Sequence, residues 1–312
     1  NLYDERLIDH AKAERTYRKL LAVAPDNTEV VTLSAVALER LYRGLQNARG
    51  LVEALELRAR HEPDQDLCRS LYAQAGEILE DELKDLPGAV AAQRARLAID
   101  PTDRDALSAL ARLYEKTAAW PDLVATLRQD AQLAGDADAQ KRLLIRAAGV
   151  LENQVRDIPA AIALYSEILE TYGADRALHG ALARLYEVSE AWNDLLDVLD
   201  RDLLVATDAP DRLALIVRIA ELRRLRTHEL SRAVEGYKEA LDLDPTEPTA
   251  RGALAALLSS DEPGVPLAAA RALDPVLQAE QAWERLVEVL DRIAADTDEP
   301  DERRQSLARA AE

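Results

Sequence analysis

The chain repeats itself at a spacing of 72 residues, and this repeat restricts the fold more than any other feature of its 312 residues. Residues 110–123 read LARLYEKTAAWPDL and residues 182–195 read LARLYEVSEAWNDL, so the shared residues recur at a constant displacement. Residues 38–42 (LERLY) and 254–258 (LAALL) continue the same register. Self-similarity at a fixed period of tens of residues is typical of architectures in which one small unit stacks on the next. The sequence therefore predicts a repeat array.

A second segment recurs inside the 72-residue unit, which predicts two helical hairpins per unit. Residues 85–89 (DLPGA), 157–161 (DIPAA) and 229–233 (ELSRA) share this second register. Prolines at positions 101 and 245 are predicted to end helices, because proline has no backbone N–H to continue the hydrogen bonding. Alanine, leucine and charged residues dominate, while methionine and phenylalanine are absent. Since most of these residues favour helix, the chain is predicted to be all-α.

The repeating residues resemble the tetratricopeptide repeat, a helix-turn-helix motif of about 34 residues. Leu110, Ala111 and Tyr114 are similar to the Leu, Gly and Tyr of its first helix, with alanine in place of glycine. The second helix and its exit are matched by Ala233, Tyr237, Ala240 and Pro245. The resemblance implies a right-handed α-solenoid whose first helices line a concave groove. Each 72-residue unit exceeds two standard repeats, and we expect the extra length in the turn around residues 80–85.

We expect one solenoid over residues 1–312, with units of about 1–34, 35–105, 106–176, 177–249 and 250–312. The last unit is irregular, since residues 259–266 (SSDEPGVP) form the strongest cluster of helix breakers in the chain. An extra short helical element is predicted at about residues 267–272. Both ends of the chain interrupt the repeat, so we expect a piece of a longer array. An engineered array is the alternative, which this irregular unit disfavours.

The formal net charge of −19 disfavours nucleic acid and anionic lipid surfaces as ligands, because both require clustered Lys and Arg. No apolar run approaches the ~18 residues that a membrane-spanning helix needs. Cys68 is the single cysteine, which excludes an internal disulfide. A reducing compartment such as the cytoplasm fits best, and a periplasmic or envelope-associated location stays open.

No constellation in the sequence predicts catalysis, a cofactor or a metal. The four histidines lie in separate units, and neither a His-Glu-x-x-His motif nor a Gly-rich phosphate loop occurs. His61 with Glu62 and Asp64 could ligate a metal, but a helix cap is the preferred interpretation. The recurring aspartates Asp64, Asp136 and Asp208 are predicted to cap helices rather than bind calcium. Cys68 adjoins an apolar stripe and is predicted to be packed rather than reactive.

Aromatic residues also recur with the repeat, and we expect them to pack between helices rather than to stack on a ligand. The tryptophans at equivalent turn positions are Trp120, Trp192 and Trp283. The tyrosines at predicted core positions are Tyr17, Tyr42, Tyr114, Tyr165, Tyr186 and Tyr237.

One charged pattern predicts a binding surface. Arg40, Arg112 and Arg184 share a repeat position, and Glu115 and Glu187 follow the last two by three residues. By the family resemblance this position faces the groove, where an arginine row could pair with carboxylates of a peptide or a partner helix. The alternative is structural: each Arg pairs with the Glu one helical turn on, or bridges neighbouring repeats.

The expected function is therefore that of a non-enzymatic scaffold that binds a protein or peptide partner. Two alternatives stay open. The chain could be a structural repeat protein that self-associates, because contacts that do not close generate filaments. It could also be the regulatory arm of a larger enzyme whose catalytic domain lies outside this chain.

Overall fold

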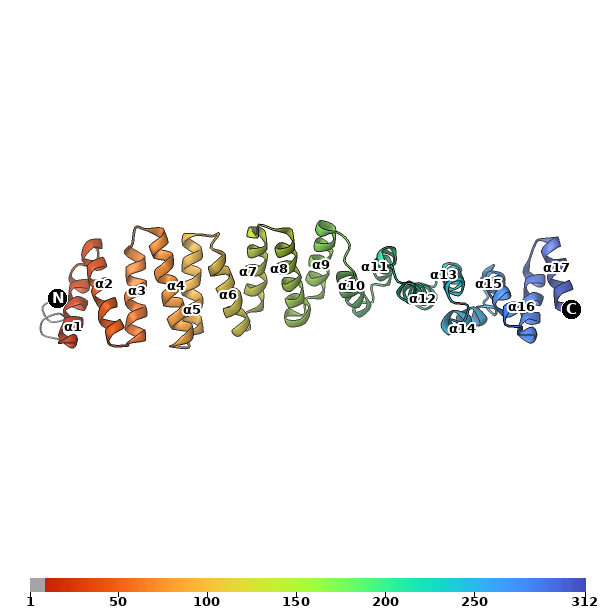
Figure 1. The fold of residues 1–312 in the computed structure, drawn as a ribbon, viewed down its shortest axis with the longest axis horizontal. Helices are drawn as coiled ribbons and strands as arrows, with labels where there is room; N and C mark the ends of the chain where they lie inside the picture. The colour runs from red at the N-terminus through yellow and green to blue at the C-terminus, as the bar shows by residue number, and fades with distance from the viewer. Residues whose placement is uncertain (1–8) are drawn as a thin grey trace. The chain divides into compact units, whose positions relative to one another are not determined.

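The computed structural model describes residues 9–312, which form 17 α-helices joined by short turns (Figure 1). Residues 1–8, part of the first predicted unit, lie outside the described residues. The described chain contains no strand, and one π-helical segment, Leu151–Val155, follows α8. The prediction of an all-α solenoid of helical hairpins is confirmed.

The chain divides into two compact units, Asn1–Leu164 and Tyr165–Glu312, with the division inside α9 (Ile158–Tyr172). The other helices of the first unit are α1 (His10–Val23), α2 (Thr28–Gly44), α3 (Ala48–His61), α4 (Gln65–Asp81), α5 (Leu86–Ile99), α6 (Arg104–Lys116), α7 (Trp120–Leu133) and α8 (Ala137–Val150). Those of the second unit are α10 (Arg176–Val188), α11 (Trp192–Val205), α12 (Ala209–Leu225), α13 (Leu230–Leu243), α14 (Pro248–Leu257), α15 (Val265–Ala279), α16 (Trp283–Asp296) and α17 (Pro300–Ala311).

Within each unit, a helix packs mainly against the helices next to it in the chain. The row from α1 to α8 shows this order directly (Figure 1). The even-numbered helices from α2 to α12 begin hairpins, and the odd-numbered helices that follow complete them. Short turns leave each helix few alternatives to packing against its predecessor, so the apolar stripes of neighbouring helices meet in a continuous core.

Polar caps fix where many of the helices begin. Asn27, Asn47, Asp85 and Asp103 each accept a hydrogen bond from a backbone N–H in the first turn of their helix. Such a cap satisfies one of the N–H groups that lack a partner within the helix. Prolines occupy the first turns of α5 and α7, where their missing N–H costs nothing.

Small residues set the distance between the two helices of a hairpin. A Cβ placed on Gly50, at the start of α3, would lie 2.6 Å from the ring of Tyr42 on α2. A Cβ on Gly76, on α4, would lie 2.6 Å from the side-chain amide of Gln93 on α5. The first helix of each hairpin therefore presents to the second a face made from small residues and from the Tyr42 position.

The turns of the hairpins contain residues in the left-handed region. Gln46, Ala118, Glu190 and Gln281 have φ of 51°, 54°, 54° and 59°, and each lies between the first and second helix of a hairpin or its equivalent. A second series at the ends of later helices comprises Lys84, Arg156 and His228. This conformation ends the helix and allows the chain to reverse within a few residues.

The last unit departs from the regular pattern, as expected, but the extra helix is longer than predicted. The element predicted at about residues 267–272 is α15, which spans 15 residues. The short helix is α14, with 10 residues, and it ends before the breaker cluster. In addition to its neighbours in the chain, α15 packs against α13. The structure therefore contains a shortened helix inserted before a full-length one.

Candidate functional site

The side chain of Arg40 lies at the rim of a shallow depression on α2 and α3, with a volume of about 410 Å³. Arg43 and Gly44 follow on α2, and Arg58 reaches the depression from α3. At its base lies the carboxylate of Glu39, a residue that is only 8% exposed. Oxygens of this carboxylate lie 2.7 Å from Arg58 Nη1 and 3.0 Å from Arg43 Nη2.

Glu39 occupies the repeat position that Ala111 and Ala183 fill in later hairpins. A carboxylate there is buried against the second helix, and burial of an unpaired charge would be strongly unfavourable. Arg58 on α3 supplies the opposite charge, and it lies within 4.0 Å of Glu62 as well. Around the single buried carboxylate of Glu39, the depression collects three guanidinium groups, which is a local excess of positive charge.

Arg112 bridges two successive first helices rather than pairing with Glu115 on its own helix. Its Nη2 lies 2.9 Å from Glu80 Oε2 on α4, and Lys116 Nζ lies 2.6 Å from the other oxygen of that carboxylate. The Glu80 side chain is 6% exposed, whereas that of Arg112 is 55% exposed. This contact matches the structural alternative in which Arg112 bridges neighbouring repeats, and it still leaves the guanidinium accessible.

The two glutamates bind arginines that the sequence did not single out. Glu115 Oε2 lies 2.8 Å from Arg146 Nη2 on α8, and Glu187 Oε2 lies 2.7 Å from Arg218 Nη2 on α12. Arg146 and Arg218 are 72 residues apart, like Glu115 and Glu187, so the internal repeat contained the signal for this pair. Arg184 is exposed on α10, in the second unit.

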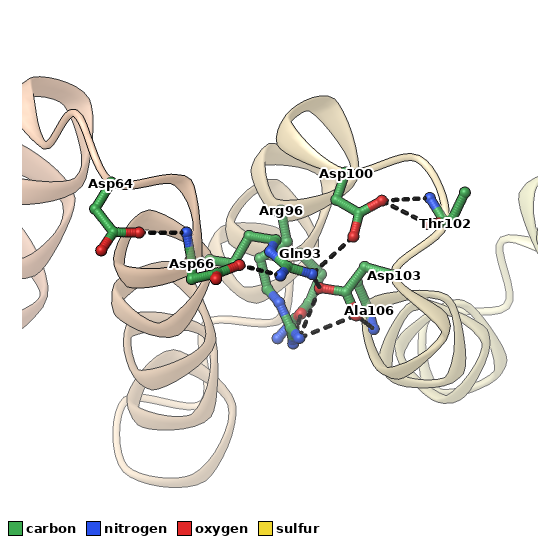
Figure 2. A network of polar contacts seen from close by, with 9 residues as sticks. Asp64, Asp66, Gln93, Arg96, Asp100, Thr102, Asp103 and Ala106 are labelled. Carbon is green, nitrogen blue, oxygen red and sulfur yellow. Dashed lines mark hydrogen bonds and ion pairs between the residues drawn. The ribbon is translucent and has the colours of Figure 1, made fainter.

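A larger polar network joins α4, α5 and the start of α6 (Figure 2). Asp103 caps α6 by accepting from the backbone N–H of Ala106, and its carboxylate also binds Arg96 at 2.9 Å. Asp100 accepts from the backbone and hydroxyl of Thr102, and these bonds lower the pKa of Asp100. Asp66, Asp100 and Asp103 surround Arg69 at 2.5, 2.7 and 3.8 Å. Because each acid in it serves a cap, a turn or an ion pair, the network is structural.

The candidate metal and calcium residues take structural roles. His61 is the last residue of α3, and its Nδ1 lies 3.0 Å from the carbonyl oxygen of Leu57. Asp64 and Asp136 cap α4 and α8 through their side chains, as predicted. Asp208 occupies the N-cap of α12, but its side chain accepts no capping hydrogen bond. Among residues 9–312, no group of three or more His, Cys, Asp or Glu side chains is placed to hold a metal ion.

Cys68 is buried, as predicted. Its thiol lies 3.0 Å from the carbonyl oxygen of Ala59 and 3.2 Å from that of Glu62. Burial, with the nearby charges of Glu62 and Asp64, raises the pKa of the thiol. The thiolate form that would act as a nucleophile or a metal ligand is therefore disfavoured.

The aromatic residues agree with a packing role except at one position. All the predicted core tyrosines are buried except Tyr186, which is half-buried. Trp120 and Trp192 are half-buried, and the Arg226 guanidinium lies 4.7 Å from the ring centroid of Trp192. Trp283 is 58% exposed, so its expected packing role is wrong. Within the part of the chain that the structure describes, no helix is both long and apolar enough to cross a membrane.

Comparison with protein-family models matches residues 106–140 to the model described as Tetratricopeptide repeat. This segment contains α6, α7 and the start of α8. A search of curated proteins finds no match.

Several solved structures are similar in outline. The C-terminal part of a TPR repeat-containing protein from Cytophaga hutchinsonii is 16% identical, with 81% of this chain and 96% of that chain covered and a TM-score of 0.33. A tetratricopeptide repeat protein from Parabacteroides merdae is 13% identical, with 96% and 100% covered and a TM-score of 0.32. For PilF from Pseudomonas aeruginosa the identity is 14%, the coverage 74% and 100%, and the TM-score 0.31. Likenesses at these TM-scores carry no inference about this chain.

Proposed function

Because the chain belongs to the tetratricopeptide-repeat family, we propose that it is a protein-interaction scaffold and that the first unit binds an acidic segment of a partner. The binding site is the arginine cluster, defined as Arg40, Arg43 and Arg58 around the depression on α2 and α3. Arg112 on α6 is a further contact for the same partner. The partner is a peptide or a protein surface that presents several carboxylates.

The observation that carries this proposal is the charge imbalance at Glu39. One buried carboxylate faces Arg58 and Arg43 while Arg40 lies at the same rim, so the depression attracts anions although the whole chain has a net charge of −19. Arginine presents planar donors that match a carboxylate in two parallel hydrogen bonds. A partner carboxylate that enters the depression would meet guanidinium groups that are already held by the fold.

Arg112 supports the same surface for a different reason. Its guanidinium is anchored by the buried Glu80, which fixes the side chain, yet more than half of that side chain remains accessible. A side chain that is already ordered loses less conformational entropy on binding than a free surface arginine. The acidic remainder of the chain disfavours nonspecific contacts with other anions, which leaves the arginine cluster selective.

The test is affinity capture from a lysate of the source cells, followed by measurement with the purified partner. We expect wild type to retain a partner and the triple variant Arg40→Ala/Arg43→Ala/Arg112→Ala to bind it at least about tenfold more weakly, since charged hydrogen bonds contribute about 1.5–3 kcal/mol each. Arg58 is left intact because it neutralises Glu39. Raising the salt concentration should weaken the wild-type complex more than the variant complex.

The matched control is Arg60→Ala, an exposed arginine on α3 whose contact is Glu56 on the same helix. This variant should bind like wild type. Equal binding by wild type and the triple variant would contradict the arginine cluster as the site. Recovery of nothing but further copies of the chain would replace the scaffold proposal by self-association.

A further inference from the structure

The irregular end of the second unit contains an apolar groove of about 490 Å³ between α14, α15 and α16. Leu273 and Leu277 of α15 contribute from one side, and Val289 of α16 from another. The contribution of α14 follows one helical face, because its lining residues Arg251, Gly252, Ala255 and Leu258 recur at spacings of three and four. We call this feature the α14 groove.

The face of α14 that lines the groove is the face that holds a second helix in the regular hairpins. Leu258 occupies the repeat position of Tyr42, and the ring of Tyr42 packs against Gly50 on α3. Ala255 occupies the position of Ala111 and Ala183, which are 5% and 3% exposed. Ala255 itself is only half-buried. The seat for a helix is therefore present on α14 but incompletely covered.

The cause is the inserted turn. A regular second helix starts a few residues after the first, whereas α14 is followed by the breaker cluster and then by α15, which also packs against α13. By packing on two helices, α15 leaves part of the α14 face uncovered. Leu273 and Leu277 then become a wall of the groove in addition to being core residues.

The charges at the groove favour an acidic occupant. Arg251 is already paired with Glu280. Arg285 and Glu288, both exposed on α16, have no hydrogen-bond or ion-pair partner among residues 9–312. Two of the three charged residues that line the groove are arginines, although carboxylates outnumber basic residues in the chain by 58 to 39. A carboxylate on an incoming helix can pair with Arg285 without displacing an existing contact.

We propose that the α14 groove binds an acidic amphipathic α-helix of a partner protein, with its apolar face against Ala255, Leu258, Leu273 and Leu277 and a carboxylate near Arg285. The lining residues of α14 span about three helical turns, so the occupant contributes about three turns. Recognition follows the helix-in-groove mode, in which apolar residues at positions i, i+3, i+4 and i+7 are the anchors. The site is separate from the arginine cluster of the first unit, and either can fail without the other.

The chain itself supplies a probe of the required chemistry. In the hairpin of the same register, α10 is followed by α11, which buries Leu195, Leu196, Val198 and Leu199 and has four aspartates. We would use a fluorescein-labelled peptide of residues 190–206 with a lactam between Asp197 and a lysine that replaces Arg201. The lactam compensates for the low helicity of short isolated helices. Fluorescence polarisation with the intact chain then gives the affinity.

Gly252 allows a blocking variant with a matched control. A Cβ at Gly252 meets no atom within 4 Å, so a side chain at this position extends into the groove without disturbing the core. We expect Gly252→Tyr to weaken peptide binding by at least about tenfold and Gly252→Ala to leave it within about twofold, since the ring fills the space of the apolar anchors. Arg285→Glu should weaken it by about threefold to tenfold, and most at low salt. A melting curve of each variant checks that the fold is retained.

Gly252→Tyr also separates the groove from the peptide's own seat on α10, which this substitution does not touch. Binding that is equal in wild type and Gly252→Tyr would overturn the proposal, and so would no binding by wild type. A peptide with Leu195→Asp and Leu199→Asp should not bind. If the wild-type chain self-associates in light scattering and Gly252→Tyr abolishes this, the occupant is a second copy, which overturns the assignment of a partner helix.

Discussion

Buried tyrosine hydroxyls in this chain are satisfied by an Arg–Glu pair. The Tyr237 hydroxyl donates to Glu221 at 2.8 Å and accepts from Arg224 Nε at 3.1 Å, and the Arg224 Nη2 binds the same carboxylate at 2.9 Å. Tyr42 has the same arrangement with Glu14 and Arg18 at the start of the first unit. An unsatisfied hydroxyl in the core would cost about 1–3 kcal/mol, so these pairs allow tyrosine to fill a core position.

This arrangement predicts a pH dependence at Glu221. Burial alone would raise its pKa, but the hydrogen bonds from Arg224 and Tyr237 outweigh burial and lower the pKa below 4.5. Since the folded form has the lower pKa, the contribution of Glu221 to stability is complete above about pH 4.5 and is lost as pH falls through the folded pKa. Glu221→Gln should therefore reduce the free energy of unfolding by roughly 1–2 kcal/mol at pH 7.

The measurement is urea unfolding of wild type and Glu221→Gln at pH 7 and at pH 3.5. We expect the difference between the two proteins to shrink at the lower pH. Glu235→Gln, an exposed position on α13, serves as the control and should leave stability unchanged at both values. A difference that stays constant with pH would show that the charge of Glu221 does not contribute.

At the scale of the elements, the hairpin turns contain avoidable strain. Ala118 ends α6 with φ of 54°, a conformation that costs an L-residue with a Cβ roughly 1 kcal/mol and that glycine adopts freely. Helices most often use glycine at this position of the turn.

We therefore expect Ala118→Gly to raise the free energy of unfolding by about 0.5–1 kcal/mol, because relief of the turn exceeds the added entropy of the unfolded chain. The neighbouring Ala119 has φ of −82°, so Ala119→Gly should give no gain. Thermal melting of the two variants side by side measures the effect. A lower melting temperature for Ala118→Gly than for wild type would rule out strain at this turn.

At the scale of the whole molecule, helices pack mainly on their neighbours in the chain, so stability should be local. Leu55→Ala removes a fully buried side chain from the core of the first unit and should cost about 2–5 kcal/mol there. Hydrogen exchange followed by mass spectrometry should show faster exchange over α2–α5, while α14–α17 exchange at the wild-type rate. A uniform increase along the chain would instead show that the array unfolds as one cooperative block.

The sequence alone predicted the helical hairpins, most of the capping residues and the buried Cys68, because these depend on local chemistry. A period of 72 residues with apolar positions at helical spacing specifies which face of each helix is buried, and Asp or Asn at a helix start specifies a cap. The packed tyrosines followed from the same period. Trp283 did not follow, because its hairpin lies beyond the irregular α14.

Only the tertiary structure decided the partners of the charged residues and the existence of the α14 groove. Arg112 and Glu115 share a helix face at a spacing that allows them to pair, yet each binds a residue of a different neighbouring helix. The rotation and offset between adjacent helices decide such contacts, and a repeat period does not specify them. The insertion was visible in the sequence, but whether α15 covers or uncovers α14 depends on how three helices share one core.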